Sequence, residues 1–119
     1  MRAIFSSTFV SAALLAGTLV PAAAQDVTSR AEALALIDGG TFRERSNSLG
    51  RDIQSSFRRG RWTQSELNGK RLGRSSYYID RRGRFCRRGQ GCETIRAIGR
   101  DFALVGRSGR VGKRFRRID

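Results

Sequence analysis

The chain has 119 residues, of which 24 are Lys or Arg, ten are Asp or Glu and none is His, so its net charge is +14. This length favours a single domain. The absence of His excludes Ser-His-Asp and Cys-His catalytic groups, and two Cys without His cannot form a four-ligand zinc site. We therefore expect a protein that is not an enzyme and that holds no metal and no cofactor.

Residues 1–24 have the order of a secretory signal peptide. Arg2 supplies a positive charge, residues 3–20 are mostly apolar, and three alanines ending at Ala24 form a small-residue cleavage site. A membrane anchor is the alternative, because the apolar run is just long enough to span a bilayer, but Ser and Thr dilute it. We expect cleavage after Ala24. The remaining residues 25–119 then form one secreted or periplasmic domain without a transmembrane segment.

Cys86 and Cys92 are the only cysteines, so a single intramolecular pairing exists. Five residues separate them, including Gly89 and Gly91, which suits a tight chain reversal. In an oxidising compartment this spacing favours a disulfide that pins a hairpin. A redox-active pair is the alternative.

A helix is predicted at about residues 29–38. Ser29 stands at the N-cap with Glu32 three residues later, which is the spacing of a capping box. Residues 31–37 are strong helix formers, and Gly39-Gly40 ends the run. We expect Leu34 and Ile37 to share the packed face. A helix this short needs support, so it is expected to cover an open end or edge of a sheet.

After Gly40 the pattern changes to short β-prone segments between glycine turns, with Asn68-Gly69 the strongest hairpin signal. Turn signals at such even spacing indicate an all-β barrel or sandwich. The fold class predicted is mainly β, an antiparallel meander forming a small barrel or half-barrel with one short N-terminal helix. About eight strands are expected, at 41–42, 53–57, 62–63, 77–79, 85–86, 94–95, 102–105 and 111–118.

Three aromatic residues have two interpretations each. Trp62 is more typical of a core position than of an exposed ring that stacks on a sugar or base. Tyr77 and Tyr78 are adjacent, so on a strand only one of them faces the core. An exposed Tyr78 beside arginines would resemble a platform for single-stranded nucleic acid, although the motif of an RNA-binding sheet is absent.

The most distinctive chemical feature is arginine, which accounts for 22 of the 24 basic residues. Guanidinium groups bind phosphate and carboxylate in a bidentate manner. If the basic segments at 81–88 and 113–117 converge, they form one positive field. Charge that serves only solubility is the alternative. The predicted anion-binding residues are Arg81, Arg82, Arg84, Arg87, Arg88, Lys113, Arg114, Arg116 and Arg117.

Three functional hypotheses follow. The first is an exported module whose arginine-rich face binds anionic polymers, lipid headgroups or, without sequence preference, nucleic acid. The second is an interaction or inhibitor protein that docks an acidic partner. The third, a small hydrolase with paired carboxylates, is disfavoured because surface ion pairs are expected for the acidic residues. The acids considered are Glu44, Asp52, Glu66, Asp80, Glu93 and Asp101.

Several segments resemble an uncharacterised family of small secreted proteobacterial proteins. They are DGGTF at 38–42, FRRGRW at 57–62, RFCRRGQGCETI at 85–96 and IGRDFALV at 98–105. The resemblance implies a periplasmic or secreted β-rich fold with a two-Cys hairpin. It implies no activity and no catalytic residues.

Overall fold

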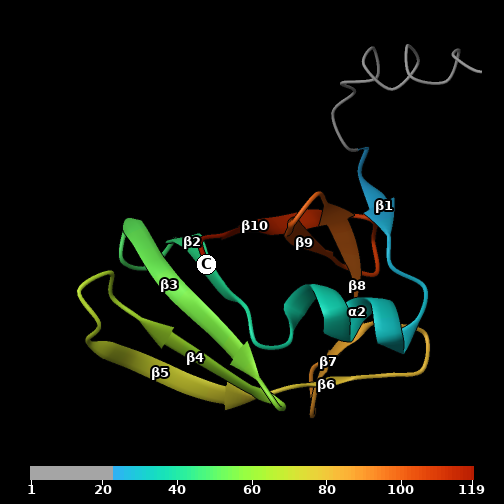
Figure 1. Ribbon diagram of the computed structural model, residues 1–119, viewed down its shortest axis with the longest axis horizontal. Helices are drawn as coiled ribbons and strands as arrows, with labels where there is room; N and C mark the ends of the chain where they lie inside the picture. The colour runs from blue at the N-terminus through green and yellow to red at the C-terminus, as the bar shows by residue number, and fades with distance from the viewer. Residues whose placement is uncertain (1–22) are drawn as a thin grey trace, which may run out of the picture.

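The computed structural model describes residues 23–119, so the predicted signal peptide lies outside the described residues except for its last two positions. Antiparallel strands and one short helix build this part of the chain (Figure 1). In chain order the elements are β1 (Gln25–Asp26), α2 (Arg30–Ile37), β2 (Thr41–Ser46), β3 (Arg51–Arg58), β4 (Arg61–Ser65), β5 (Arg71–Ser76), β6 (Tyr78–Ile79), β7 (Phe85–Arg87), β8 (Gly91–Ile98), β9 (Asp101–Val105) and β10 (Val111–Arg117).

The strands form one antiparallel sheet in the order β5-β4-β3-β2-β10-β9-β8-β7-β6, and β1 pairs with β8 at the side. Sequential hairpins give every pairing along this path except one, between β2 and β10, where Arg43 faces Arg116. The two ends of the path, β5 and β6, are consecutive in the chain and separated only by Tyr77. Since the chain itself joins the two ends, the sheet is a nearly closed barrel, which confirms the predicted fold class.

The number of strands differs from the prediction of about eight, because β1 and β5 were not expected. β5 lies at an end of the sheet path, and its side chains are mostly exposed. An edge strand of this kind needs no alternation of apolar and polar residues, so the sequence RLGRSS carries no strand signal. The Asn68-Gly69 turn sets its pairing with β4, with Gly69 at φ +96°.

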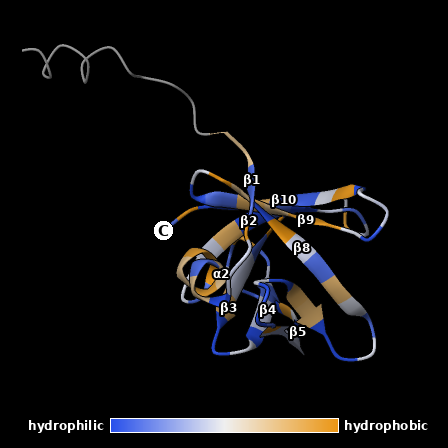
Figure 2. Cartoon of the chain, turned by 90° about the vertical axis from the view of Figure 1, so that its right-hand side faces the viewer, coloured by the Kyte–Doolittle hydropathy of each residue, from blue (hydrophilic) through white to orange (hydrophobic). Residues whose placement is uncertain are grey.

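The core is an aromatic cluster inside the barrel, centred on Phe57. Polar and apolar residues alternate along the surrounding strands (Figure 2). Phe42, Phe102 and Phe115 pack edge-on around Phe57 at centroid distances of 5.7 to 5.8 Å. Trp62 stacks on Phe57 at 5.4 Å and is buried, so its prediction as a core residue is confirmed.

The adjacent tyrosines divide as predicted. Tyr77 is buried and stacks on Phe85 at 5.1 Å, whereas the side chain of Tyr78 is 54% exposed. The main-chain N–H of Tyr77 donates to the carbonyl of Gly60 at 2.9 Å. Tyr77 thereby ties the β5–β6 junction to the β3–β4 turn.

Helix α2 lies against one end of the barrel (Figure 1). The main-chain N–H of Glu32 donates to Oγ of Ser29 at 3.1 Å, which confirms the predicted N-cap. Ala33 and Ile37 are buried, whereas Leu34 is exposed, so the expectation that Leu34 packs inward is wrong. Residues i and i+4 lie on the same helix face, and the pair 33 and 37 occupies the inner face, which leaves Leu34 at its side.

The Cys86–Cys92 disulfide joins two residues that face each other on β7 and β8, which confirms the predicted hairpin bridge. Disulfides persist in oxidising compartments, so the bridge is consistent with a periplasmic or extracellular protein. Within residues 23–119 there is no helix with the length and apolar character of a membrane span.

Candidate anion-binding site

Two rows of polar side chains cross the outer surface of strands β2 to β5. Thr41 faces Ser56, Ser56 faces Thr63, and Thr63 faces Arg74, so these four residues form one row. In the neighbouring row Arg58 faces Arg61. Side chains alternate between the two faces of a strand. The buried aromatic residues adjacent in sequence, such as Phe57, therefore put both rows on the outside.

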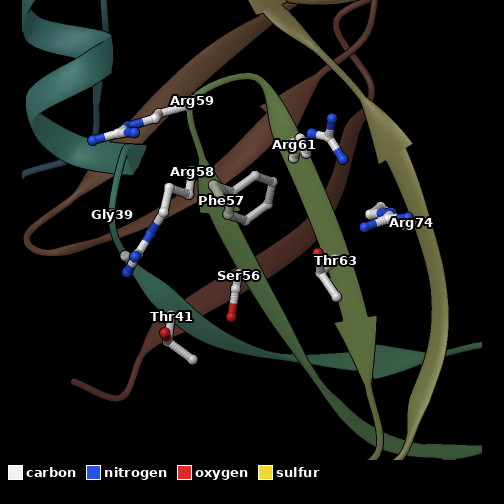
Figure 3. Close-up of a pocket in the computed structure, with 10 residues that line it drawn as sticks. Gly39, Thr41, Ser56, Phe57, Arg58, Arg59, Arg61, Thr63 and Arg74 are labelled. Carbon is white, nitrogen blue, oxygen red and sulfur yellow. The ribbon is translucent and has the colours of Figure 1, made fainter.

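These rows line a cavity of about 380 Å³, which Arg59, Gly39 and Gly40 complete. Ser56 and Thr63 lie in the middle, with Arg58 on one side and Arg61 and Arg74 on the other (Figure 3). All four arginines are exposed. We call the set of Arg58, Arg59, Arg61 and Arg74, with the hydroxyl groups of Thr41, Ser56 and Thr63, the four-arginine site.

Arg59 has an unusual backbone conformation within this site. Its φ of +51° makes it the one non-glycine residue with positive φ in the described chain, and Gly60 follows at +80°. Two consecutive positive φ values form the tight turn that suits a two-residue hairpin. For a residue with a long side chain this conformation costs about 1 kcal/mol or more. The main-chain N–H of Arg59 donates to Oδ1 of Asp38 at 2.8 Å, which holds the turn in place.

Asp38 also accepts a hydrogen bond from the hydroxyl of Tyr77 at 3.5 Å. Burial, together with the negative charge of Asp38, raises the pKa of Tyr77 to about 12. The phenol therefore stays protonated and remains a donor to Asp38 at neutral pH. Asp38 thus links Arg59 of the β3–β4 turn to Tyr77 at the β5–β6 junction, and it acts as an anchor for the turn.

None of the four arginine side chains forms an ion pair with a carboxylate among residues 23–119, although eight other basic residues do. Their charges are therefore not neutralised within the described part of the chain. Guanidinium and hydroxyl groups are hydrogen-bond donors that suit phosphate, sulfate or carboxylate oxygens. The site therefore carries the donor groups and the positive charge that an anion-binding surface requires.

Five of the nine residues predicted for anion binding form ion pairs with carboxylates of the described chain, outside the four-arginine site. Arg84 pairs with Asp80 at 2.7 Å, and Arg114 with Asp101 at 2.9 Å. Lys113, Arg116 and Arg117 pair with Glu44, Asp52 and Asp119, respectively, at 3.3, 3.5 and 2.8 Å. Arg81, Arg82 and Arg88 are exposed and form no ion pair with another described residue, and Arg87 lies 5.6 Å over the ring of Trp62.

Seven of these nine residues border cavities, which lie in different places. Arg82 and Arg84 border one beside Asp26, Arg87 and Arg88 border a second beside Tyr78, and Lys113, Arg114 and Arg116 border a third beside Arg45. In the sheet, β9 lies between β10 and the hairpin of β7 and β8. Across the barrel interior, however, Lys113 and Arg87 line one further cavity. The four-arginine site was missed because Arg74 joins the Arg58-Arg59 doublet only through the pairing of β5 with β4.

The acidic residues mostly form the expected surface ion pairs. Asp52, Glu66, Asp80 and Asp101 each pair with an arginine. Two of the six acids differ. Glu44 pairs with Lys113 inside the barrel, where its side chain is 1% exposed, and Glu93 forms no ion pair with a described residue.

Asp80 is held by Arg84. Burial by itself would raise the pKa of Asp80, but hydrogen bonds from the main chain and side chain of Arg84, its positive charge and the main-chain N–H of Arg82 bring the pKa below its ordinary value. Asp80 also lies close to both sulfur atoms of the disulfide. Since these sulfurs are bonded to each other, they are not thiolate ligands for a metal.

No family model, curated protein or solved structure matches this chain. The resemblance to small secreted proteobacterial proteins stays a hypothesis.

Proposed function

We propose that this protein is an exported, non-catalytic module that binds anionic polymers through the four-arginine site. The observation that supports this most directly is the gathering of four guanidinium groups around one cavity, without an ion-pair partner in the described chain. Three hydroxyl groups from neighbouring strands lie among them. The phosphate, sulfate or uronate groups of an anionic polymer would form the ion pairs that these arginines lack within the described chain.

Export is part of the proposal. The sequence predicts a signal peptide, and the disulfide is typical of oxidising compartments. Cleavage after Ala24 leaves Gln25 as the first residue, which is also the first residue of β1. The proposed processing therefore keeps every described strand and the helix intact.

The experiment measures heparin affinity of the purified protein as a function of salt. Polyanion binding releases counterions, so log K falls linearly with log salt, with a slope set by the number of neutralised charges. The variant R58Q/R61Q/R74Q removes three charges from the site. We expect it to bind heparin at least about tenfold more weakly at physiological salt and to have a slope smaller by about two to three.

The matched control is R81Q/R107Q/R110Q, which removes the same charge from exposed turn positions outside the site. It should retain most of the affinity and slope. Equal losses in the two variants would show that net charge alone drives binding and would overturn the assignment of the site. Heparin and DNA affinities no higher than those of a protein of ordinary charge would overturn the proposed function itself.

A further inference from the structure

The side chains that line the interior of the barrel change from aromatic to polar along its length. The aromatic layer of Phe42, Phe57 and Phe115 lies at the end that carries α2, where the main-chain N–H of Gly39 donates to the carbonyl of Phe57. Two positions further along the strands, the inward-facing side chains are charged or polar. This polar layer consists of Glu44, Ser55, Gln64, Arg87, Glu93 and Lys113.

Glu44 is the most deeply buried charged member of the polar layer, with its side chain 1% exposed. Its Oε1 lies 3.3 Å from Nζ of Lys113, and its Oε2 accepts hydrogen bonds from Ser55 and Gln64. Ser55 in turn accepts from Nε1 of Trp62 at 3.0 Å. Glu44 is therefore neutralised and fully hydrogen-bonded within the protein.

Arg87 and Glu93 lie in the same layer but, unlike Glu44, have no ion-pair partner in the described chain. They are diagonal neighbours on β7 and β8, since Phe85 faces Glu93 and Arg87 faces Gly91. Neither forms an ion pair with any described residue, and they do not pair with each other. One positive and one negative group in this layer thus have no ion-pair partner among the described residues, and Arg87 lies 5.6 Å over the ring of Trp62.

Both groups line a cavity of about 300 Å³ at this end of the barrel. Trp62, Leu104 and Phe115 provide its apolar wall. The volume equals that of about ten water molecules in the liquid, which is enough for a compact molecule of similar heavy-atom count. Mouths of small β-barrels are frequent ligand sites.

A purely structural role does not explain this layer well. Removing a charged group such as Glu44 from water costs several kcal/mol, and well-packed apolar residues at such positions are often as stable or more so. Arg87 and Glu93 are half-buried and add two further charges to the same layer. Sequences depart from an apolar interior mainly at functional sites. The combination of a cavity, an apolar wall and two opposite charges without an ion-pair partner in the described chain favours a ligand over a scaffold.

We propose that the polar end of the barrel binds a small zwitterion with an apolar body, of which an apolar α-amino acid is the simplest example. The carboxylate of the ligand pairs with Arg87, its ammonium group pairs with Glu93, and its side chain packs against Trp62, Leu104 and Phe115. This site is separate from the four-arginine site and needs no polyanion. The two proposals therefore stand or fall independently.

The test is isothermal titration of the purified protein with L-leucine. The comparison compounds are 4-methylpentanoate, which lacks the ammonium group, and 3-methylbutylamine, which lacks the carboxylate. We expect saturable one-to-one binding of L-leucine and at least about tenfold weaker binding of each comparison compound, because each leaves one half-buried charge of the cavity without an ion-pair partner. No binding of L-leucine, L-methionine or L-phenylalanine at about 10 mM would overturn the proposal.

Variants locate the site. Arg87→Gln and Glu93→Gln should each weaken L-leucine binding at least about tenfold, whereas the large loss of heparin affinity is expected only in R58Q/R61Q/R74Q. Arg88→Gln is the matched control, because Arg88 has the same charge on the same hairpin but does not line this cavity. The melting temperature of each variant shows whether it is folded. Equal weakening by R87Q and R88Q, with both variants folded, would show that binding does not use this cavity.

Discussion

At the scale of single residues, Tyr77 is a buried residue with a titratable hydroxyl group. Tyr77 has its hydroxyl near Asp38 and its ring stacked on Phe85. Burial and the charge of Asp38 raise its pKa to about 12 from an ordinary value of 10. The folded protein therefore holds this proton more tightly than the unfolded chain does. The stability that results is fully present below pH 10 and is lost as the pH rises towards 12.

Tyr77→Phe keeps the stacked ring and removes the titrating hydroxyl. We expect the melting temperature of the wild type to fall between about pH 10 and pH 12, and that of Y77F to fall less over the same interval. Thermal unfolding followed by circular dichroism across this range measures the difference. Tyr78→Phe is the control, because Tyr78 is half exposed, and it should follow the wild type. Parallel curves for the wild type and Y77F would contradict the assigned pKa shift.

At the scale of elements, the contact between the β6–β7 turn and the start of α2 is the tightest backbone approach at any described glycine. Gly83 has φ +79°, and a Cβ placed on it would lie 2.5 Å from the carbonyl oxygen of Ser29. Ser29 is the N-cap of α2. Only a residue without a side chain therefore allows this hairpin to pack against the helix.

Gly83→Ala should destabilise the protein by about 2–4 kcal/mol, because backbone strain adds to a steric overlap with main-chain atoms. Gly89→Ala is a matched control, since Gly89 also has φ +79° but no atom lies within 4 Å of a Cβ there. We expect it to cost only about 1 kcal/mol. Urea unfolding of both variants measures the difference. Equal losses would mean that the approach of the hairpin to Ser29 is not tight in solution.

At the scale of the whole molecule, the main feature is the excess of positive over negative side chains. The described residues include 23 basic and ten acidic side chains, and eight of the basic ones are in ion pairs. Exposed ion pairs contribute about 0–1 kcal/mol each. Repulsion among the remaining positive charges opposes the compact state. Added salt screens both the attraction within the ion pairs and the repulsion among the unpaired cations. Because the unpaired cations outnumber the paired ones, we expect the loss of repulsion to be the larger effect.

We therefore expect the melting temperature to rise when NaCl is increased from about 10 mM to about 150 mM, because the Debye length shortens from about 30 Å to about 8 Å. The variant R58Q/R61Q/R74Q, with three fewer unpaired cations, should show a smaller rise. Differential scanning calorimetry at neutral pH measures both. A melting temperature that falls with salt would show that the ion pairs outweigh the repulsion.

The sequence by itself determined the local features. The capping box of Ser29, the glycine turns and the Cys86–Cys92 bridge each depend on residues within a few positions of one another. Local geometry is sufficient for them, because caps, tight turns and short loops close within one or two turns of chain. The choice of a mainly β fold followed from the same spacing.

Only the tertiary structure decided which charges are neighbours. The four-arginine site needs β5 to pair with β4, and the burial of Glu44 needs the barrel to close between β2 and β10. Strand pairing joins residues far apart in the chain, and a shift of one residue in register reverses the face of every side chain. The sequence therefore specified an arginine-rich barrel, while the pairing of its strands determined where the arginines gather.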